Sequence, residues 1–216
     1  MVKFNFKSNE IVNADGEKIF KNSEFEFEPG ITVLVGCNGS GKTTLMNTIQ
    51  NHLDHNIKYS KHYALQSKQM MEQAMTFSHG SDRVNAIDYF GYSNWASEGE
   101  GIFRRFEYLV QNLGYYVLNE CKNQSEGWIF LDSLDSGMSI DNIQEVKDFL
   151  QNIVLGETLP ENLNLYILIA ANSYEFAKDQ RCLDVQNAKY ISFENYEDYV
   201  EFILESRNYK DNRTVV

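Results

Sequence analysis

One stretch of eight residues constrains the fold of this chain more than any other. Gly36-Cys37-Asn38-Gly39-Ser40-Gly41-Lys42-Thr43 follows the pattern G-x-x-x-x-G-K-T, a glycine-rich turn that places backbone N–H groups around a phosphate. The apolar run 31–35 before it predicts a buried strand, and residues 44–49 after it predict the start of a helix. Such a loop works between a strand and a helix, because the helix N-terminus adds its positive dipole end.

The loop predicts which side chains hold a nucleotide. Lys42 is expected to reach the β- and γ-phosphates of ATP, and Thr43 is expected to bind Mg²⁺. Further contacts are expected from the loop and the residue after it: Gly36, Asn38, Gly39, Ser40, Gly41 and Thr44. The alternative is a glycine turn without a ligand, and the flanking strand and helix argue against it.

A second acidic ligand is predicted where another buried strand ends. The apolar run Trp128-Ile129-Phe130-Leu131 is followed directly by Asp132. Ligands of open α/β sheets bind at the carboxyl ends of the strands. We therefore expect Asp132 to lie opposite Thr43 and to orient the water shell of the metal.

Strands that alternate with helices predict a single α/β domain over residues 1–216. The hairpin signal Asp15-Gly16 and the alternation of Phe and Glu over 24–28 predict an antiparallel flank within the first 35 residues. The stretch 51–94 is polar and irregular. Together with a helix expected over 99–119, it forms an expected small helical subdomain, 51–120.

The second half of the chain carries stronger patterns. Apolar spacing predicts helices over 141–153 and 196–207, with frayed residues after the last helix. Apolar runs predict a third buried strand over 163–170 and an edge strand over 189–193.

Composition narrows the class of partner and the compartment. The net charge of −12 opposes non-specific binding to duplex nucleic acid. A basic patch formed by Lys58, Lys61, Lys68 and Arg83 is the alternative, although such scattered charges usually form a solvated loop. No apolar run is long enough to span a membrane. The 3 scattered cysteines predict a reducing compartment, so the chain is expected in the cytoplasm and off the membrane.

Three motifs together resemble those of ABC-type ATPases. Residues 36–44 read G-x-N-G-x-G-K-T-T, residues 131–139 line up with L-D-E-P-x-S-G-L-D, and Ser97-Glu98-Gly99-Glu100 resembles the S-x-G-E signature. The resemblance covers about Ile19 to Phe193. The signature is closer to that of the SMC, Rad50 and RecF branch than to that of transporters. The chain is also similar to small ATP-binding cassette proteins encoded by bacteriophages.

The resemblance implies a P-loop NTPase fold and a particular assembly. In this family two subunits meet head to tail, and each ATP lies between the loop of one and the signature of the other. Ser97, Gly99 and Glu100 would then contact ATP bound by a partner, which implies an ATP-dependent homodimer. The alternative is local, since Ser97 and Glu100 also suit a helix capping box.

The sequence departs from the family at three positions around the γ-phosphate. Ser133 stands where the family places the Glu that polarises water, Asn172 where it places a switch His, and Ser139 where it places an Asp. A hydroxyl is not a general base at neutral pH, and losing such a base costs about 10²–10⁴ in rate. Lys42, Asp132, Ser133 and Asn172 are thus the candidate catalytic set of a weak ATPase.

Two functions remain open from the sequence. The favoured one is an ATP-binding switch with slow or absent hydrolysis. The alternative is a competent ATPase subunit of a DNA-repair, packaging or defence complex, with a protein or nucleic-acid partner, in which Asp135 or a partner completes the site. Phe20 is expected in the core, with stacking on adenine as its alternative. The Mg²⁺-sensing glutamine is left open among Gln66, Gln69 and Gln73.

Overall fold

A computed structural model gives the architecture and describes residues 1–7, 12–13, 16–56, 61–66, 109–110, 112–136, 138–155 and 159–213. Its centre is a six-stranded sheet. The strands are β3 (Gly30–Val35), β4 (Lys61–Gln66), β5 (Glu126–Asp132), β6 (Asn164–Ala170), β7 (Cys182–Asp184) and β8 (Lys189–Ile191). Their spatial order is β4-β5-β6-β3-β7-β8. All neighbours pair in parallel except β8, which runs antiparallel to β7 at the edge.

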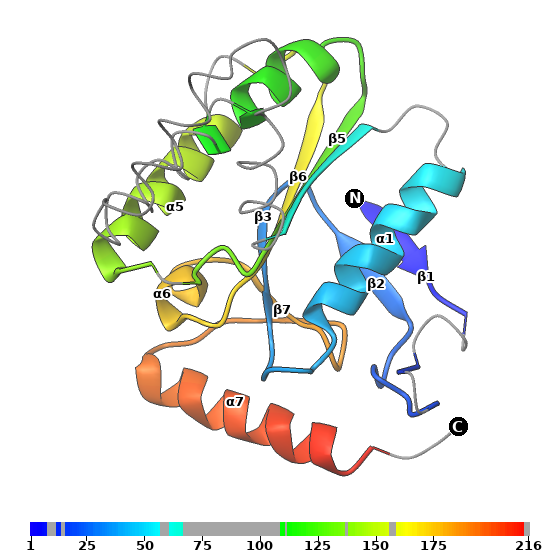
Figure 1. Cartoon of the computed structure of the whole chain (residues 1–216), viewed down its shortest axis with the longest axis vertical. Coiled ribbons are helices and arrows are strands. Elements are labelled where there is room, and N and C mark those ends of the chain that lie inside the picture. Colours follow the sequence, from blue (N-terminus) through cyan, green and yellow to red (C-terminus); the bar gives the residue numbers. More distant parts are fainter. Residues whose placement is uncertain are drawn as a thin grey trace, which may run out of the picture.

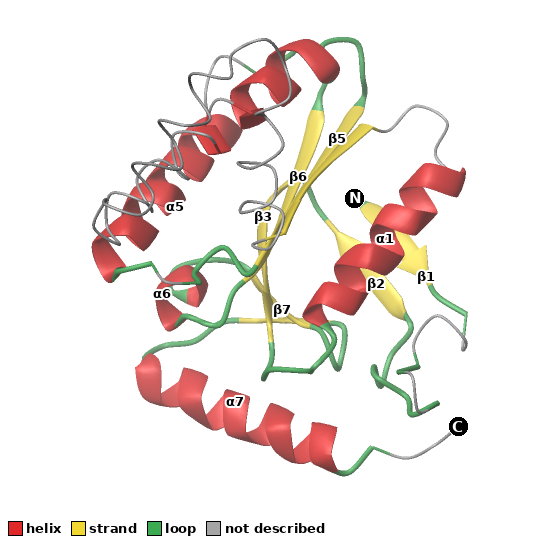
Figure 2. Cartoon of the chain, in the orientation of Figure 1, coloured by secondary structure: helices red, strands yellow, loops and turns green. Residues whose placement is uncertain are grey.

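Helices cover both faces of this sheet (Figure 1). One face carries α1 (Lys42–Asn56) and a two-stranded antiparallel sheet made of β1 (Val2–Asn5) and β2 (Glu24–Phe27). The other face carries α5 (Ile140–Leu155), α6 (Tyr174–Ala177) and the π-helical turn η3 (Tyr116–Glu120). The last helix, α7 (Tyr196–Asp211), lies beside the loop that joins β3 to α1 (Figure 2).

Strand β5 shows how the sequence builds the two cores. Its side chains alternate between the faces, as the period of a strand requires. Trp128 and Phe130 pack with α1 and the small sheet, whereas Ile129 and Leu131 pack with α5. Because both faces are covered, the strand reads as one continuous apolar run that ends only at Asp132.

Most elements predicted from periodicity are confirmed. The buried strands expected over 31–35, 128–131 and 163–170 are β3, β5 and β6. The expected edge strand is β8, and the expected antiparallel flank is the β1–β2 pair. The helices expected over 141–153 and 196–207 are α5 and α7. The mixed α/β fold with a mostly parallel sheet is that of a P-loop NTPase.

Three features differ from the expectations. Strand β4 lies in the stretch 51–94, which was expected to be irregular; within the described residues it pairs only with β5, and a polar composition is tolerated at such an edge. Strand β7 has three residues and is too short to give a pattern. Helix α7 continues past the expected end at residue 207 to Asp211, and Lys210 and Arg213 contact the β3–α1 loop, whereas residues 214–216 of the expected frayed end lie outside the described residues.

The remaining domain prediction stays a prediction. Much of the expected helical subdomain, including Ser97, Gly99 and Glu100, lies outside the described residues, as do Lys58, Lys68 and Arg83. Residues 112–115 are helical, in agreement with the end of the helix expected over 99–119. No helix in the described part of the chain is both long and apolar enough to cross a membrane.

Trp128 tests the core that holds β5 in place. Its ring is fully buried and stacks on Tyr166 at 4.2 Å between ring centroids. Trp128→Ala is expected to lower the free energy of unfolding by about 3–5 kcal/mol, because the cavity refills only partly. Urea unfolding followed by circular dichroism measures the change. The control Leu204→Ala, at a side chain that is 58% exposed, is expected to stay within about 0.5 kcal/mol of wild type. A similar loss in both variants would contradict this account.

Candidate nucleotide site

The site lies at the edge where the carboxyl ends of three strands meet. Leu34 of β3 is in register with Ala170 of β6, and Ala170 is in register with Asp132 of β5. The residues after this row leave the sheet together: the loop 36–41, Ser133, and Asn172. The sheet register therefore assembles segments that are almost 100 and 40 residues apart in the sequence.

The glycine-rich loop is closed by local hydrogen bonds. Ser40 donates its backbone N–H to the carbonyl of Cys37 at 3.0 Å, and Leu45 donates to the carbonyl of Gly41 at 2.8 Å, which starts α1. Gly41 has φ +110°, and a Cβ built on it would lie 2.4 Å from Ile19 Cγ2 and 2.6 Å from a ring carbon of Phe20. Only glycine fits this position, because both the backbone angle and the space exclude a side chain.

Lys42 is folded back over the loop. Its Nζ donates to the carbonyl oxygens of Gly36 at 2.7 Å and Cys37 at 3.2 Å, and the residue is 9% exposed. Burial lowers the pKa of Lys42 from its ordinary value of 10.5, whereas nearby Cys37, Asp135 and Asp132 oppose this shift. A phosphate anion placed beside Lys42 would favour its charged form further, so the loop has a cation suited to such a ligand.

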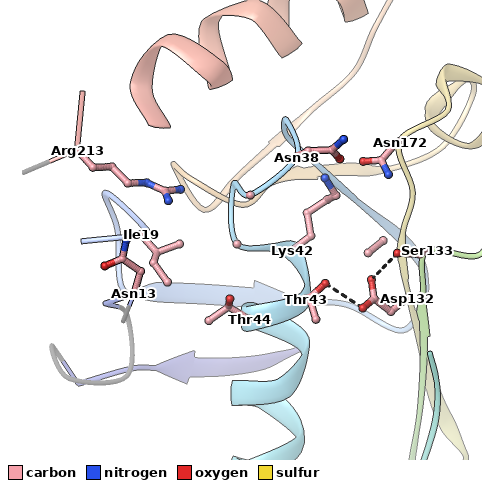
Figure 3. A pocket seen from close by; sticks show the side chains of 13 residues that line it. Asn13, Ile19, Asn38, Lys42, Thr43, Thr44, Asp132, Ser133, Asn172 and Arg213 are labelled. Carbon is pink, nitrogen blue, oxygen red and sulfur yellow. Dashed lines mark hydrogen bonds between the residues drawn. The ribbon is translucent and has the colours of Figure 1, made fainter. Parts of the chain in front are cut away.

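Thr43 and Asp132 form the pair expected for a metal. The Thr43 hydroxyl donates to Asp132 Oδ2 at 2.9 Å (Figure 3). Among the described residues no group of three or more His, Cys, Asp or Glu side chains is arranged to hold a metal ion. A hydroxyl and one carboxylate nevertheless suit Mg²⁺, which keeps several waters and takes other ligands from substrate phosphates. These residues fit the ion only together with a phosphate.

Ser133 occupies its place with a strained backbone. It has φ +56°, in the left-handed region, and donates its N–H to the Ala170 carbonyl at 2.9 Å. Its hydroxyl donates to Asp132 Oδ1 at 3.4 Å, as Figure 3 shows. The hydroxyl thus faces the carboxylate, where it orients Asp132 and has no capacity to act as a base at neutral pH.

Asp135 holds the turn that carries Asn172. Its Oδ2 accepts the backbone N–H groups of Asn172 and Ser173, each at 2.7 Å. The Asn172 carbonyl accepts the hydroxyl of Tyr199 at 2.8 Å. The backbone of Asn172 is thereby fixed on both sides. Asp135 Oδ2 is engaged by two backbone N–H groups, which argues against the substitute-base alternative.

A cavity of about 230 Å³ lies over these residues. Nine of the residues expected at the site line it: Asn38, Gly39, Gly41, Lys42, Thr43, Thr44, Asp132, Ser133 and Asn172. Gly36 and Ser40 belong to the loop behind it, and Ser139 precedes α5, where its carbonyl accepts the N–H of Ile143 at 3.0 Å. Ser97, Gly99 and Glu100 lie outside the described residues.

Four lining residues were not predicted: Asn13, Ile19, Ala170 and Arg213. No sequence motif marks the first three. Arg213 follows Ser206 and Lys210 at helical spacing, which signals a shared polar face but not what that face contacts. Phe20 is fully buried, as expected for a core residue. The side chain that lines the cavity is that of its neighbour Ile19.

The register also bears on the Mg²⁺-sensing glutamine. Gln66, the last residue of β4, pairs with Asp132 across the β4–β5 ladder. Gln69 and Gln73 lie outside the described residues. The backbone of Gln66 thus reaches the edge that carries Asp132, and the choice among the three glutamines stays open.

Comparison with known proteins identifies the family. A family model described as an AAA domain (AAA_23) matches residues 15–213. This is a family of P-loop ATPases found in SMC- and Rad50-like proteins. Domains of this kind bind nucleotide, generally with Mg²⁺. No curated protein matches the sequence. The resemblance to bacteriophage proteins is not tested by these comparisons and stays a prediction.

Gly41 tests the shape of the loop. Gly41→Ala is expected to lower the free energy of unfolding by about 1–3 kcal/mol, because alanine is strained at φ +110° and meets Ile19 and Phe20. Thermal unfolding measures the effect. The matched control is Gly114→Ala, in a helical segment where an added Cβ meets no atom of the described residues within 4 Å. That control is expected to stabilise the protein by about 0.5–1 kcal/mol. Shifts of the same sign in the two variants would contradict the prediction.

Proposed function

This chain belongs to the AAA domain family of P-loop ATPases, and we propose that it binds Mg-ATP and acts as an ATP-dependent dimerisation switch with slow hydrolysis. The observation that carries the binding step is the Thr43–Asp132 hydrogen bond beside the buried ammonium of Lys42. These groups supply a cation for phosphate oxygens and two oxygens for Mg²⁺. Bound Mg²⁺ would neutralise phosphate charge, while the loop N–H groups fix the orientation of the phosphates.

Binding is tested with Lys42→Ala. The substitution removes charge-assisted hydrogen bonds worth about 1.5–3 kcal/mol each, so affinity for Mg-ATP is expected to fall by about 100-fold or more in calorimetry. Lys189→Ala, at an exposed lysine of β8, is the control and is expected to bind as wild type does. Undiminished affinity in the Lys42 variant would sink the assignment of the site.

The proposed dimer rests on the sequence motif Ser97-Glu98-Gly99-Glu100-Gly101. In the family arrangement this motif contacts ATP held by the opposite subunit. The net charge of −12 makes two copies repel each other, so a bridging Mg-ATP at each interface would be needed to offset the repulsion.

Assembly is tested by light scattering at physiological salt. Wild type is expected to change from monomer to dimer on adding Mg-ATP. Ser97→Arg is expected to stay monomeric, because its side chain would displace the contact to the partner's nucleotide, and its unchanged ATP affinity would serve as the control. A wild-type chain that remains monomeric with saturating Mg-ATP leaves the capping-box alternative as the account of this motif.

Slow hydrolysis follows from the groups around the γ-phosphate position. Ser133 is turned toward Asp132, and Asp135 is occupied by two backbone N–H groups. No carboxylate other than Asp132 lines the cavity among the described residues. Water at the γ-phosphate would therefore lack a base. The activation free energy of ATP hydrolysis is therefore expected to be about 3–5 kcal/mol higher than in a site that has a base.

Restoring a carboxylate at position 133 tests this account. Ser133→Glu and Ser133→Asp are both expected to raise steady-state turnover, with Asp better suited to the left-handed backbone at φ +56°. Ser133→Asn is the matched control, because asparagine tolerates the same backbone and is not a base. Wild-type turnover near 10 s⁻¹, the median for enzymes, would instead favour the competent ATPase subunit of a repair, packaging or defence complex.

A further inference from the structure

We propose that Arg213, two residues after the end of α7, binds the nucleoside part of the nucleotide and forms the base subsite together with Ile19. This inference rests on the proposed binding of Mg-ATP and adds a residue that the loop motif does not include. Arg213 lines the same cavity as Lys42 and Thr43. It comes from the opposite end of the chain, 170 residues after Thr43.

The two ends of the cavity are lined by different groups. Thr43, Asp132 and Ser133 mark the end where the metal and the γ-phosphate would lie. Figure 3 shows Arg213 and Ile19 on the other side of the loop from Asp132 and Asn172. A nucleoside triphosphate with its terminal phosphate at Asp132 therefore extends its nucleoside toward Arg213 and Ile19.

Packing of α7 on the loop fixes the place of Arg213. Ser206 is buried, and its Oγ accepts the backbone N–H of Cys37 at 3.0 Å. Lys210 lies over the loop, since a Cβ on Gly39 would meet its Cδ at 3.4 Å. Arg213 then donates from Nη2 to the carbonyl of Ser40 at 3.1 Å. Ser206 and Lys210 lie on one face of α7 at a spacing of four, and Arg213 follows two residues after the helix ends at Asp211.

The guanidinium retains an unused donor. Its Nε is shielded from solvent and has no hydrogen-bond partner among the described residues. A buried N–H without an acceptor is costly, so this atom marks a place for an acceptor. Purine ring nitrogens and ribose hydroxyls are acceptors of the required kind, and the flat guanidinium also stacks on aromatic rings.

The neighbourhood favours a base over a phosphate. Ile19 offers an apolar side chain beside Arg213 in the cavity. A flat base can contact an apolar side chain on one face and a guanidinium on the other. A phosphate at the same place would lose hydration against Ile19, and no second cation among the described lining residues lies at this end of the cavity to compensate. Lys42 and the loop N–H groups already serve the phosphates.

The test compares Mg-ATP with Mg-tripolyphosphate, which has the phosphates but no nucleoside. For Arg213→Ala, calorimetry is expected to give about a tenfold loss of affinity for Mg-ATP and unchanged affinity for Mg-tripolyphosphate. Arg213→Lys keeps the charge but loses the flat face and the Nε donor, so it is expected to lose affinity for Mg-ATP as well. Arg207→Ala, at a 68% exposed side chain of α7, is the control and is expected to bind both ligands as wild type does.

Several outcomes would overturn the inference. Equal losses for the two ligands would make Arg213 a phosphate contact, and unchanged affinity for both would remove it from the site. Thermal unfolding of each variant shows whether the loop has lost its support, in which case both ligands weaken together and the inference fails. The failure of the proposed function looks different, because wild type itself would then bind neither ligand.

Discussion

The hydrogen bond between Thr43 and Asp132 depends on the register of the central sheet, and the rest of the site depends on that register. Leu34, Ala170 and Asp132 form one row across β3, β6 and β5. A shift of one residue in either ladder would turn the apolar side chains of a strand to the wrong face. The two cores therefore fix the row, and the row places the loop, the carboxylate and Asn172 at one edge. Function here relies on packing that lies several residues away from any ligand.

Support for the loop comes from both ends of the chain. From the N-terminal side, Ile19 and Phe20 fill the space that Gly41 leaves open. From the C-terminal side, α7 provides an acceptor for the Cys37 N–H through Ser206 and places Lys210 beside Gly39. A phosphate loop needs a rigid backbone, because its N–H groups must already point at the ligand. The contacts of α7 supply this rigidity on the side of the loop away from Asp132.

The sequence predicts the parts of this arrangement that local patterns control. The loop, the buried strands β3, β5 and β6, and the helices α5 and α7 have strong periodicity or motif context, and the structure has them. Strand β4 was missed because its polar composition gives no apolar pattern, and such a composition is acceptable for a strand that pairs, within the described residues, with β5 alone. The contact between Arg213 and Ser40 was missed for a different reason. It joins residues 173 positions apart, and no local pattern encodes such a contact.

The site has the groups that nucleotide binding needs, whereas its described residues offer no base for hydrolysis. Binding needs a cation, backbone N–H groups and a metal oxygen, and these come from one local motif plus one aspartate. Hydrolysis also needs a base that faces the attacking water. That role depends on the residues that follow β5 and β6, here Ser133 and Asn172. Here Ser133 is turned to Asp132, and the turn at Asn172 is held by Asp135 and Tyr199. The Ser133 hydroxyl and the Asp135 carboxylate are thus engaged in holding other groups in place, which is the physical basis of the proposal that hydrolysis is slow.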